Sequence, residues 1–145
     1  QRQMCIRDRE KTVLPLAGLH LLLAEDNELN SEIATTLLEE QGASITAVEN
    51  GRLALEAIQN AAPRTYDAIL MDVMMPEMNG LEATRCIRAF EGKGPGEGTP
   101  IIAMTANVFA DDVKACLDAG MNSHVGKPLD MKVLIGEILK YTNAR

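Results

Sequence analysis

The chain has 145 residues, of which 46% are hydrophobic and 24% are charged, a composition typical of one globular domain with its own core. Its net charge of −7 argues against a nucleic-acid partner and against contact with an anionic membrane, because both attract basic protein surfaces. The sequence contains no apolar run near the roughly 18 residues that a membrane-spanning helix needs, so we expect no such helix.

Residues 1–17 differ from the rest of the chain. Basic and acidic residues are mixed in the first ten positions, without the apolar segment of a secretory signal, and Pro15 stands just before the first strand-like segment. We therefore expect a leader or linker remnant that is not part of the fold. The folded domain is expected over residues 18–143.

From residue 18 onward, short apolar segments alternate with segments that have helical spacing of apolar residues. We expect strands at residues 20–25, 44–48, 67–72, 101–104 and 123–125. We expect helices from 30 or 31 to Gly42, at 53–60, 80–90 and 108–119, and from Asp130 onward. For the first helix, Asn30 or Ser31 can serve as the N-terminal cap, and Asn27 is an alternative.

This strand–helix alternation predicts an α/β fold of the (βα)5 type. The strands are apolar without alternation, which is typical of a parallel sheet that is covered by helices on both faces. Residues 91–100 contain four glycines and two prolines, so we expect an exposed loop there. Ligands of such sheets bind beyond the carboxyl ends of the strands.

Acidic residues follow two of these strands. Glu25 ends the first strand and Asp26 follows it, and Asp72 ends the third strand. At neighbouring strand ends these carboxylates would crowd together and raise one another's pKa values, and a hard divalent cation would relieve that repulsion. Oxygen ligands of this kind suit Mg²⁺, and the backbone carbonyl of Met74 can complete the shell.

The remaining strand ends add groups that can handle a phosphoryl group. Next to a bound cation, Asp72 can act as a nucleophile and form an acyl phosphate. Lys127, after the fifth strand, supplies a positive charge for the phosphoryl oxygens. Thr105, at the end of the fourth strand, offers a hydroxyl donor.

Four motifs in order carry a family resemblance: Leu-Ala-Glu25-Asp26-Asn, Leu-Met-Asp72-Val-Met-Met-Pro-Glu-Met-Asn-Gly, Met-Thr105-Ala and Gly-Lys127-Pro-Leu. Over about residues 18–142 the chain resembles the receiver domain of two-component response regulators. The segments Glu-Asp-Asn-Glu-Leu-Asn and Asp-Ala-Gly-Met-Asn make it most similar to receivers of hybrid histidine kinases.

The resemblance implies a flavodoxin-like three-layer sandwich with the strand order 2-1-3-4-5. It implies that Asp72 is the phosphoacceptor. The implied Mg²⁺ ligands are Glu25, Asp26, Asp72 and the Met74 carbonyl, while Thr105 and Lys127 contact the phosphoryl group.

The resemblance also implies a conformational switch and a partner surface. His124 occupies the position of a switch side chain that is often Tyr or Phe in the family, and a structural role for His124 remains equally open. Leu29, Ile33 and Pro128 are implied contacts for a phosphohistidine-bearing partner, although Ile33 fits the core as well.

The function expected on this basis is Mg²⁺-dependent transfer of a phosphoryl group from phosphohistidine to Asp72, followed by a change in partner binding. We expect a cytoplasmic domain, monomeric or weakly dimeric, from the C-terminal part of a hybrid sensor histidine kinase. The given chain has no kinase core and would catalyse only its own phosphorylation and dephosphorylation. The alternatives are a stand-alone response regulator and a scaffold that works without phosphorylation.

Overall fold

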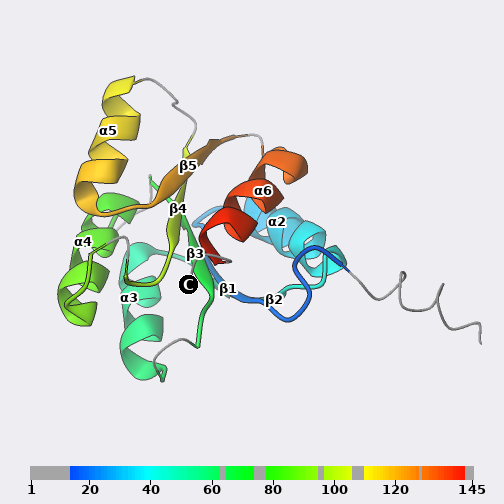
Figure 1. Cartoon of the computed structure of the whole chain (residues 1–145), viewed down its shortest axis with the longest axis horizontal. Coiled ribbons are helices and arrows are strands. Elements are labelled where there is room, and N and C mark those ends of the chain that lie inside the picture. Colours follow the sequence, from blue (N-terminus) through cyan, green and yellow to red (C-terminus); the bar gives the residue numbers. More distant parts are fainter. Residues whose placement is uncertain are drawn as a thin grey trace, which may run out of the picture.

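Five parallel strands form one sheet in the order β2-β1-β3-β4-β5, as shown in Figure 1. The computed structural model describes residues 14–62, 65–73, 78–94, 97–105, 110–127 and 129–142, with only the backbone for 110–112. The strands are β1 (His20–Ala24), β2 (Ser44–Val48), β3 (Ala68–Asp72), β4 (Ile101–Thr105) and β5 (Ser123–Gly126). The sheet order and the parallel pairing confirm the predicted α/β fold.

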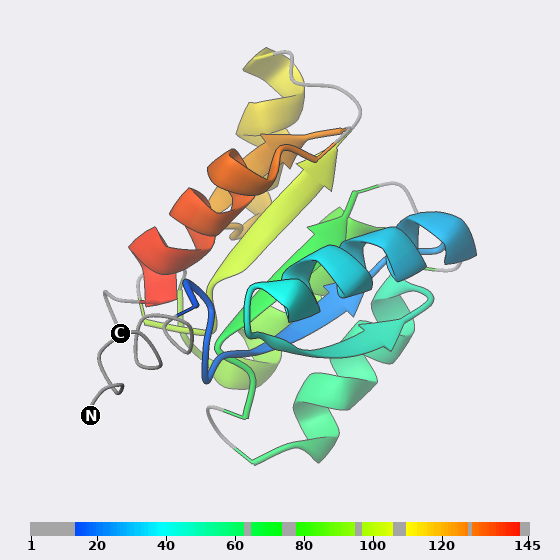
Figure 2. The same cartoon turned by 90° about the vertical axis from the view of Figure 1, so that its right-hand side faces the viewer.

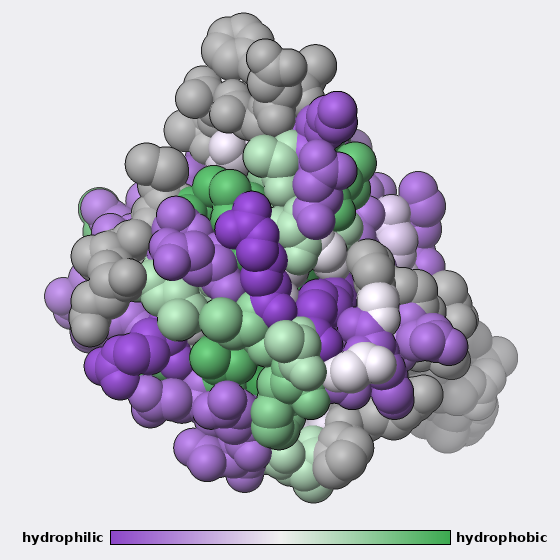
Figure 3. Space-filling view, turned by 90° about the vertical axis from the view of Figure 1, so that its left-hand side faces the viewer, coloured by the Kyte–Doolittle hydropathy of each residue, from purple (hydrophilic) through white to green (hydrophobic). Residues whose placement is uncertain are grey.

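Helices cover both faces of this sheet. They are α2 (Glu28–Glu40), α3 (Gly51–Asn60), α4 (Gly80–Glu91), α5 (Ala110–Ala119) and α6 (Met131–Thr142). In Figures 1 and 2, α2 and α6 lie on one face, and α3, α4 and α5 lie on the other. Figure 3 looks onto the α3–α4–α5 side, where hydrophilic residues surround smaller hydrophobic areas.

Two apolar cores fill the spaces between the sheet and its two helix layers. Strand residues alternate between them: Leu22 and Ile69 pack toward α3, α4 and α5, whereas Leu21 and Leu70 pack toward α2 and α6. Successive side chains of a strand point to opposite faces, so an uninterrupted apolar strand serves both cores. This explains the absence of alternation in the sequence.

Asparagines cap three of the helices. The side-chain oxygens of Asn27, Asn50 and Asn79 accept hydrogen bonds from backbone N–H groups of the first turns of α2, α3 and α4, at 2.8–2.9 Å. The expectation that Asn30 or Ser31 caps the first helix was wrong, and the alternative cap, Asn27, is the one observed. The helix consequently begins at Glu28 and includes Asn30 in its first turn.

Arg88 stabilises the end of the sheet that lies opposite to the acidic strand ends. Its buried guanidinium donates to the backbone oxygens of Gly120 and Thr99 and to Oδ1 of Asn122, each at 2.8 Å, and to Oε1 of Glu91 at 3.0 Å. These bonds join the last turn of α4 to the starts of β4 and β5. Sequence reasoning did not single out this arginine.

The end of the predicted leader contributes to the core. Leu16 is completely buried against the α2–α6 side, and its backbone N–H donates to the carbonyl of Gln41 at 2.9 Å. Residues 1–13 lie outside the described residues, so their place relative to the fold stays a prediction. The expectation that residues 1–17 are not part of the fold is wrong for Leu16, because its aliphatic side chain is buried in the core between the sheet and α2 and α6.

We expect Leu16→Ala to lower the free energy of unfolding by about 2–5 kcal/mol, because truncation of a buried leucine leaves a cavity. Chemical denaturation of the purified domain measures this loss. Leu14→Ala is the matched control, since Leu14 is 39% exposed and should change stability by only about 0.5 kcal/mol. Similar small effects for both variants would show that Leu16 is not a core residue.

Candidate functional site

Three carboxylates gather at the carboxyl ends of two neighbouring strands. Glu25 and Asp26 follow β1, and Asp72 ends β3, which pairs with β1 in parallel. One ligand atom of each residue lies within 4.8 Å of those of the others. The structure therefore brings together the three acids that the sequence placed at separate strand ends.

These carboxylates differ in their exposure. Only 4% of Glu25 and 4% of Asp72 are accessible, whereas Asp26 is exposed. Buried charges of like sign are costly unless an opposite charge or a metal ion lies beside them. The arrangement is thus unfavourable by itself and favourable toward a cation.

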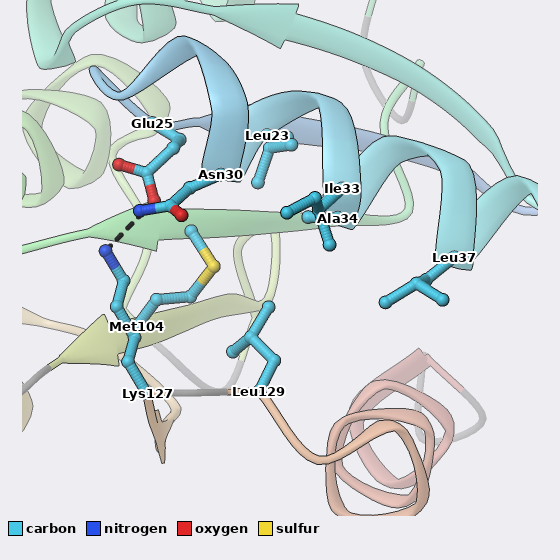
Figure 4. A pocket seen from close by; sticks show the side chains of 9 residues that line it. All are labelled: Leu23, Glu25, Asn30, Ile33, Ala34, Leu37, Met104, Lys127 and Leu129. Carbon is cyan, nitrogen blue, oxygen red and sulfur yellow. Dashed lines mark hydrogen bonds and ion pairs between the residues drawn. The ribbon is translucent and has the colours of Figure 1, made fainter.

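Lys127 provides part of the missing positive charge. Its Nζ atom donates to Oε1 of Glu25 at 2.9 Å and to Oδ2 of Asp72 at 3.1 Å, and Figure 4 shows the contact with Glu25. The backbone N–H of Lys127 donates to the carbonyl of Thr105 at 2.9 Å. The lysine is therefore held next to the end of β4 and reaches across to the ends of β1 and β3.

The protonation equilibria reflect this crowding. Burial raises the pKa of the Glu25 carboxyl, and the adjacent Asp72 raises it further, while the hydrogen bond from Lys127 lowers it only in part. Burial lowers the pKa of the Lys127 ammonium, but its bonds to Glu25 and Asp72 outweigh burial, so that its pKa is raised overall. One ammonium therefore does not fully relieve the repulsion between the carboxylates.

Thr105 and His124 lie on one face of the sheet. Thr105 ends β4 and is buried, and His124 in β5 is partly buried and pairs with Ala103. Residues two apart on a strand and residues paired between strands share a face, so Thr105, Ala103 and His124 all point toward the α3–α4–α5 side. Ala103 belongs to the core on that side.

Two predicted site residues lie outside the described residues. These are Met74, expected to offer a backbone carbonyl, and Pro128, expected to contact a partner. The two other expected partner contacts are on the surface of α2, where Leu29 is 65% exposed and Ile33 is 49% exposed.

A groove of about 480 Å³ leads from the acidic site along α2. It runs between α2 and the segment before α6, and its lining is mostly apolar, with Glu25 and Lys127 at one end (Figure 4). The lining residues are Leu23, Glu25, Asn30, Ile33, Ala34, Leu37, Met104, Lys127 and Leu129. Sequence reasoning missed Asn30, Leu37 and Leu129 as site residues. The spacing of apolar residues predicts which side chains face the core, but not where a groove stays open between two elements.

The chain is similar to known proteins. The response regulator receiver domain family matches residues 21–139. Probable histidine kinase 1 of Oryza sativa subsp. indica is 41% identical over 77% of this chain, and sensor histidine kinase GacS of Pseudomonas protegens is 37% identical over 94% of it. The chain spans only 14% of the length of each of these two relatives.

Solved structures agree in fold. The receiver domain of sensor histidine kinase PA1611 from Pseudomonas aeruginosa, crystallised with magnesium in its active-site cleft, is 37% identical with a TM-score of 0.76; the match covers 88% of this chain and 99% of that one. The structure of the Ssk1 receiver domain of Saccharomyces cerevisiae with the histidine phosphotransfer protein Ypd1 is 25% identical to this chain, with a TM-score of 0.78. The match covers 88% of this chain and 91% of that one.

The chain therefore belongs to the response regulator receiver domain family. It is a receiver domain of two-component signalling, related to the receiver domains of sensor histidine kinases, which confirms the resemblance that the motifs indicated. Within the described part of the chain, no helix has the length and apolar character needed to cross a membrane.

We expect Asp72→Asn to melt roughly 2–4 °C higher than the wild type in EDTA at neutral pH, which corresponds to about 1 kcal/mol. The substitution removes one of the crowded charges, while the introduced amide oxygen still accepts from Lys127. The advantage should shrink as the pH falls and Glu25 takes up its proton, because repulsion requires two ionised groups. Differential scanning fluorimetry measures both effects.

Asp118→Asn is the control for net charge, since Asp118 is exposed on α5. A metal-free melting temperature of Asp72→Asn at or below that of the wild type would contradict the crowding of the carboxylates.

Proposed function

We propose that Asp72 is the phosphoacceptor of this receiver domain and takes its phosphoryl group from phosphohistidine in a Mg²⁺-dependent reaction. The carrying observation is that Lys127 reaches both Asp72 and Glu25 beside the exposed Asp26. The site thereby combines a nucleophile, a fixed positive charge and a cation-binding acid cluster. An Asp with these neighbours is suited to phosphoryl transfer rather than to a structural role.

The residues fit Mg²⁺ as the cofactor. Three carboxylate oxygens within 4.8 Å of one another form an oxygen-only donor set, which Mg²⁺ prefers, and the PA1611 receiver is a solved relative with magnesium in its cleft. We assign Glu25, Asp26 and Asp72 as ligands, together with the Met74 carbonyl. Bound Mg²⁺ supplies positive charge that offsets the carboxylates and the oxygens of an arriving phosphoryl group.

The chain's own residues carry the transfer. A carboxylate oxygen of Asp72 attacks phosphorus, a P–O bond forms, and the P–N bond breaks with its electron pair returning to the donor imidazole. Lys127, 3.1 Å from Asp72 Oδ2, is placed to pair with the phosphoryl oxygens. Thr105 follows as a hydroxyl donor to the new phosphate, and His124, on the same face, is the switch side chain.

For the partner, we propose a phosphohistidine-bearing kinase or phosphotransfer domain that docks on α2. Leu29 and Ile33 expose apolar surface on α2, and Ile33 also lines the groove. Pro128, which lies outside the described residues, is the third proposed contact. The co-crystal structure of Ypd1 with the Ssk1 receiver domain supports the kind of partner, because it pairs a histidine phosphotransfer protein with a related receiver domain. We further propose a cytoplasmic domain, a monomer or weak dimer without nucleic-acid binding, from a hybrid sensor histidine kinase.

Intact-mass spectrometry after treatment with acetyl phosphate tests the acceptor. We expect one added phosphoryl group in Mg²⁺, at least about tenfold less in EDTA, and none in Asp72→Asn. Asp118→Asn, which removes an exposed carboxylate elsewhere, should be labelled like the wild type. Undiminished labelling of Asp72→Asn would refute the assignment. A folded wild-type protein without any adduct, from this donor or from phosphohistidine, would favour the scaffold.

Docking on α2 is tested separately. Ile33→Glu places a charge on the proposed contact surface, so transfer from a phosphorylated phosphotransfer domain should slow about tenfold, whereas labelling by acetyl phosphate should persist. Leu117→Glu is the matched control, because Leu117 is equally exposed at 48% but lies on α5. Equal slowing by both variants would argue against α2 as the docking helix.

A further inference from the structure

Asn30 brings a carboxamide to the edge of the candidate site. Because Asn27 caps α2 and accepts from the backbone N–H of Asn30 at 2.9 Å, Asn30 occupies a fixed place in the first helical turn. In Figure 4 its side chain leans from α2 toward Glu25 and toward the contact between Glu25 and Lys127. The residue is exposed, so an arriving molecule can reach it.

Asn30 differs from the other groove residues in what it can offer. Two polar residues share the groove with it, Glu25 and Lys127, and these bond to each other. The rest of the lining is apolar. The carboxamide carries one acceptor oxygen and two N–H donors, so its oxygen can accept a hydrogen bond from a ring that carries an N–H.

We infer that Asn30 is a donor-positioning residue: its carboxamide hydrogen-bonds the imidazole of the phosphohistidine that delivers the phosphoryl group. This inference rests on the proposed function of Asp72. Lys127 lies between Asp72 and the groove, since it bonds Asp72 and also lines the groove. Phosphoryl oxygens beside Lys127 thus place the ring on the groove side, next to Asn30.

The role of this hydrogen bond follows from where the electron pair and the proton of the donor ring go during the transfer. Phosphohistidine protonated on its second ring nitrogen loses the phosphoryl group to Asp72, the P–N electron pair stays on the first nitrogen, and neutral imidazole leaves. The Asn30 oxygen accepts from the N–H of the second nitrogen, which orients the ring and favours its protonated form. Acetyl phosphate has no such N–H, so this contact discriminates between the two kinds of donor.

The test compares two small donors, monophosphoimidazole and acetyl phosphate, on the whole chain with Mg²⁺, using intact mass to follow the rate of labelling. For Asn30→Ala we expect the ratio of the monophosphoimidazole rate to the acetyl phosphate rate to fall about tenfold, the typical loss for one hydrogen bond to a charged group. Asn30→Gln keeps a carboxamide and should recover part of the ratio.

Asn60→Ala makes the same substitution at the exposed end of α3 and should leave the ratio unchanged. An unchanged ratio in Asn30→Ala, or equal slowing with both donors, would overturn the inference while leaving Asp72 as the acceptor. No labelling of the wild type by either small donor or by a phosphorylated phosphotransfer domain would overturn the proposed function, and this inference with it. Melting temperatures of all variants show whether a rate change reflects a folded protein.

Discussion

The bridge from Lys127 to Glu25 and Asp72 is the interaction on which the site depends. It joins the ends of β1, β3 and β5, which are far apart in the sequence, through one ammonium group. Without it two buried carboxylates would face each other without the positive charge of Lys127. The pKa of the Glu25 carboxyl is still raised, first by burial and then by the adjacent Asp72, although the hydrogen bond from Lys127 lowers it.

The sheet separates the two sides of this site. The groove and α2 lie on the α2–α6 face, where Leu23 and Met104 belong to the core of that face. Thr105 and His124 point to the opposite face, toward α3, α4 and α5. A donor that arrives over α2 and a switch that acts through Thr105 would therefore use different surfaces, and a docked donor need not block the response.

Much of the fold and the acid cluster could be predicted, because each depends on short-range signals. Uninterrupted apolar strands indicate a parallel sheet, and parallel strands bring their carboxyl ends to one edge, which is why Glu25 and Asp72 were placed together correctly. The groove and the burial of Leu16 depend instead on how side chains from distant segments pack. The spacing of apolar residues in the sequence does not predict such grooves or such contacts between distant segments.

The position of the N-terminal cap of α2 affects which side chains lie beside the acidic site. Asn27 and Asn30 are both good caps by composition, and a start at either position satisfies the same number of backbone N–H groups. With the start at Asn27, the Asn30 side chain lies in the first turn and leans toward the Glu25–Lys127 pair. Glu25 Oε2 also accepts from the backbone N–H of Asn27 at 3.3 Å, so the buried acid contacts the residue that caps the helix. The cap of α2, the buried Glu25 and the side chain of Asn30 are therefore linked through the short connection between β1 and α2.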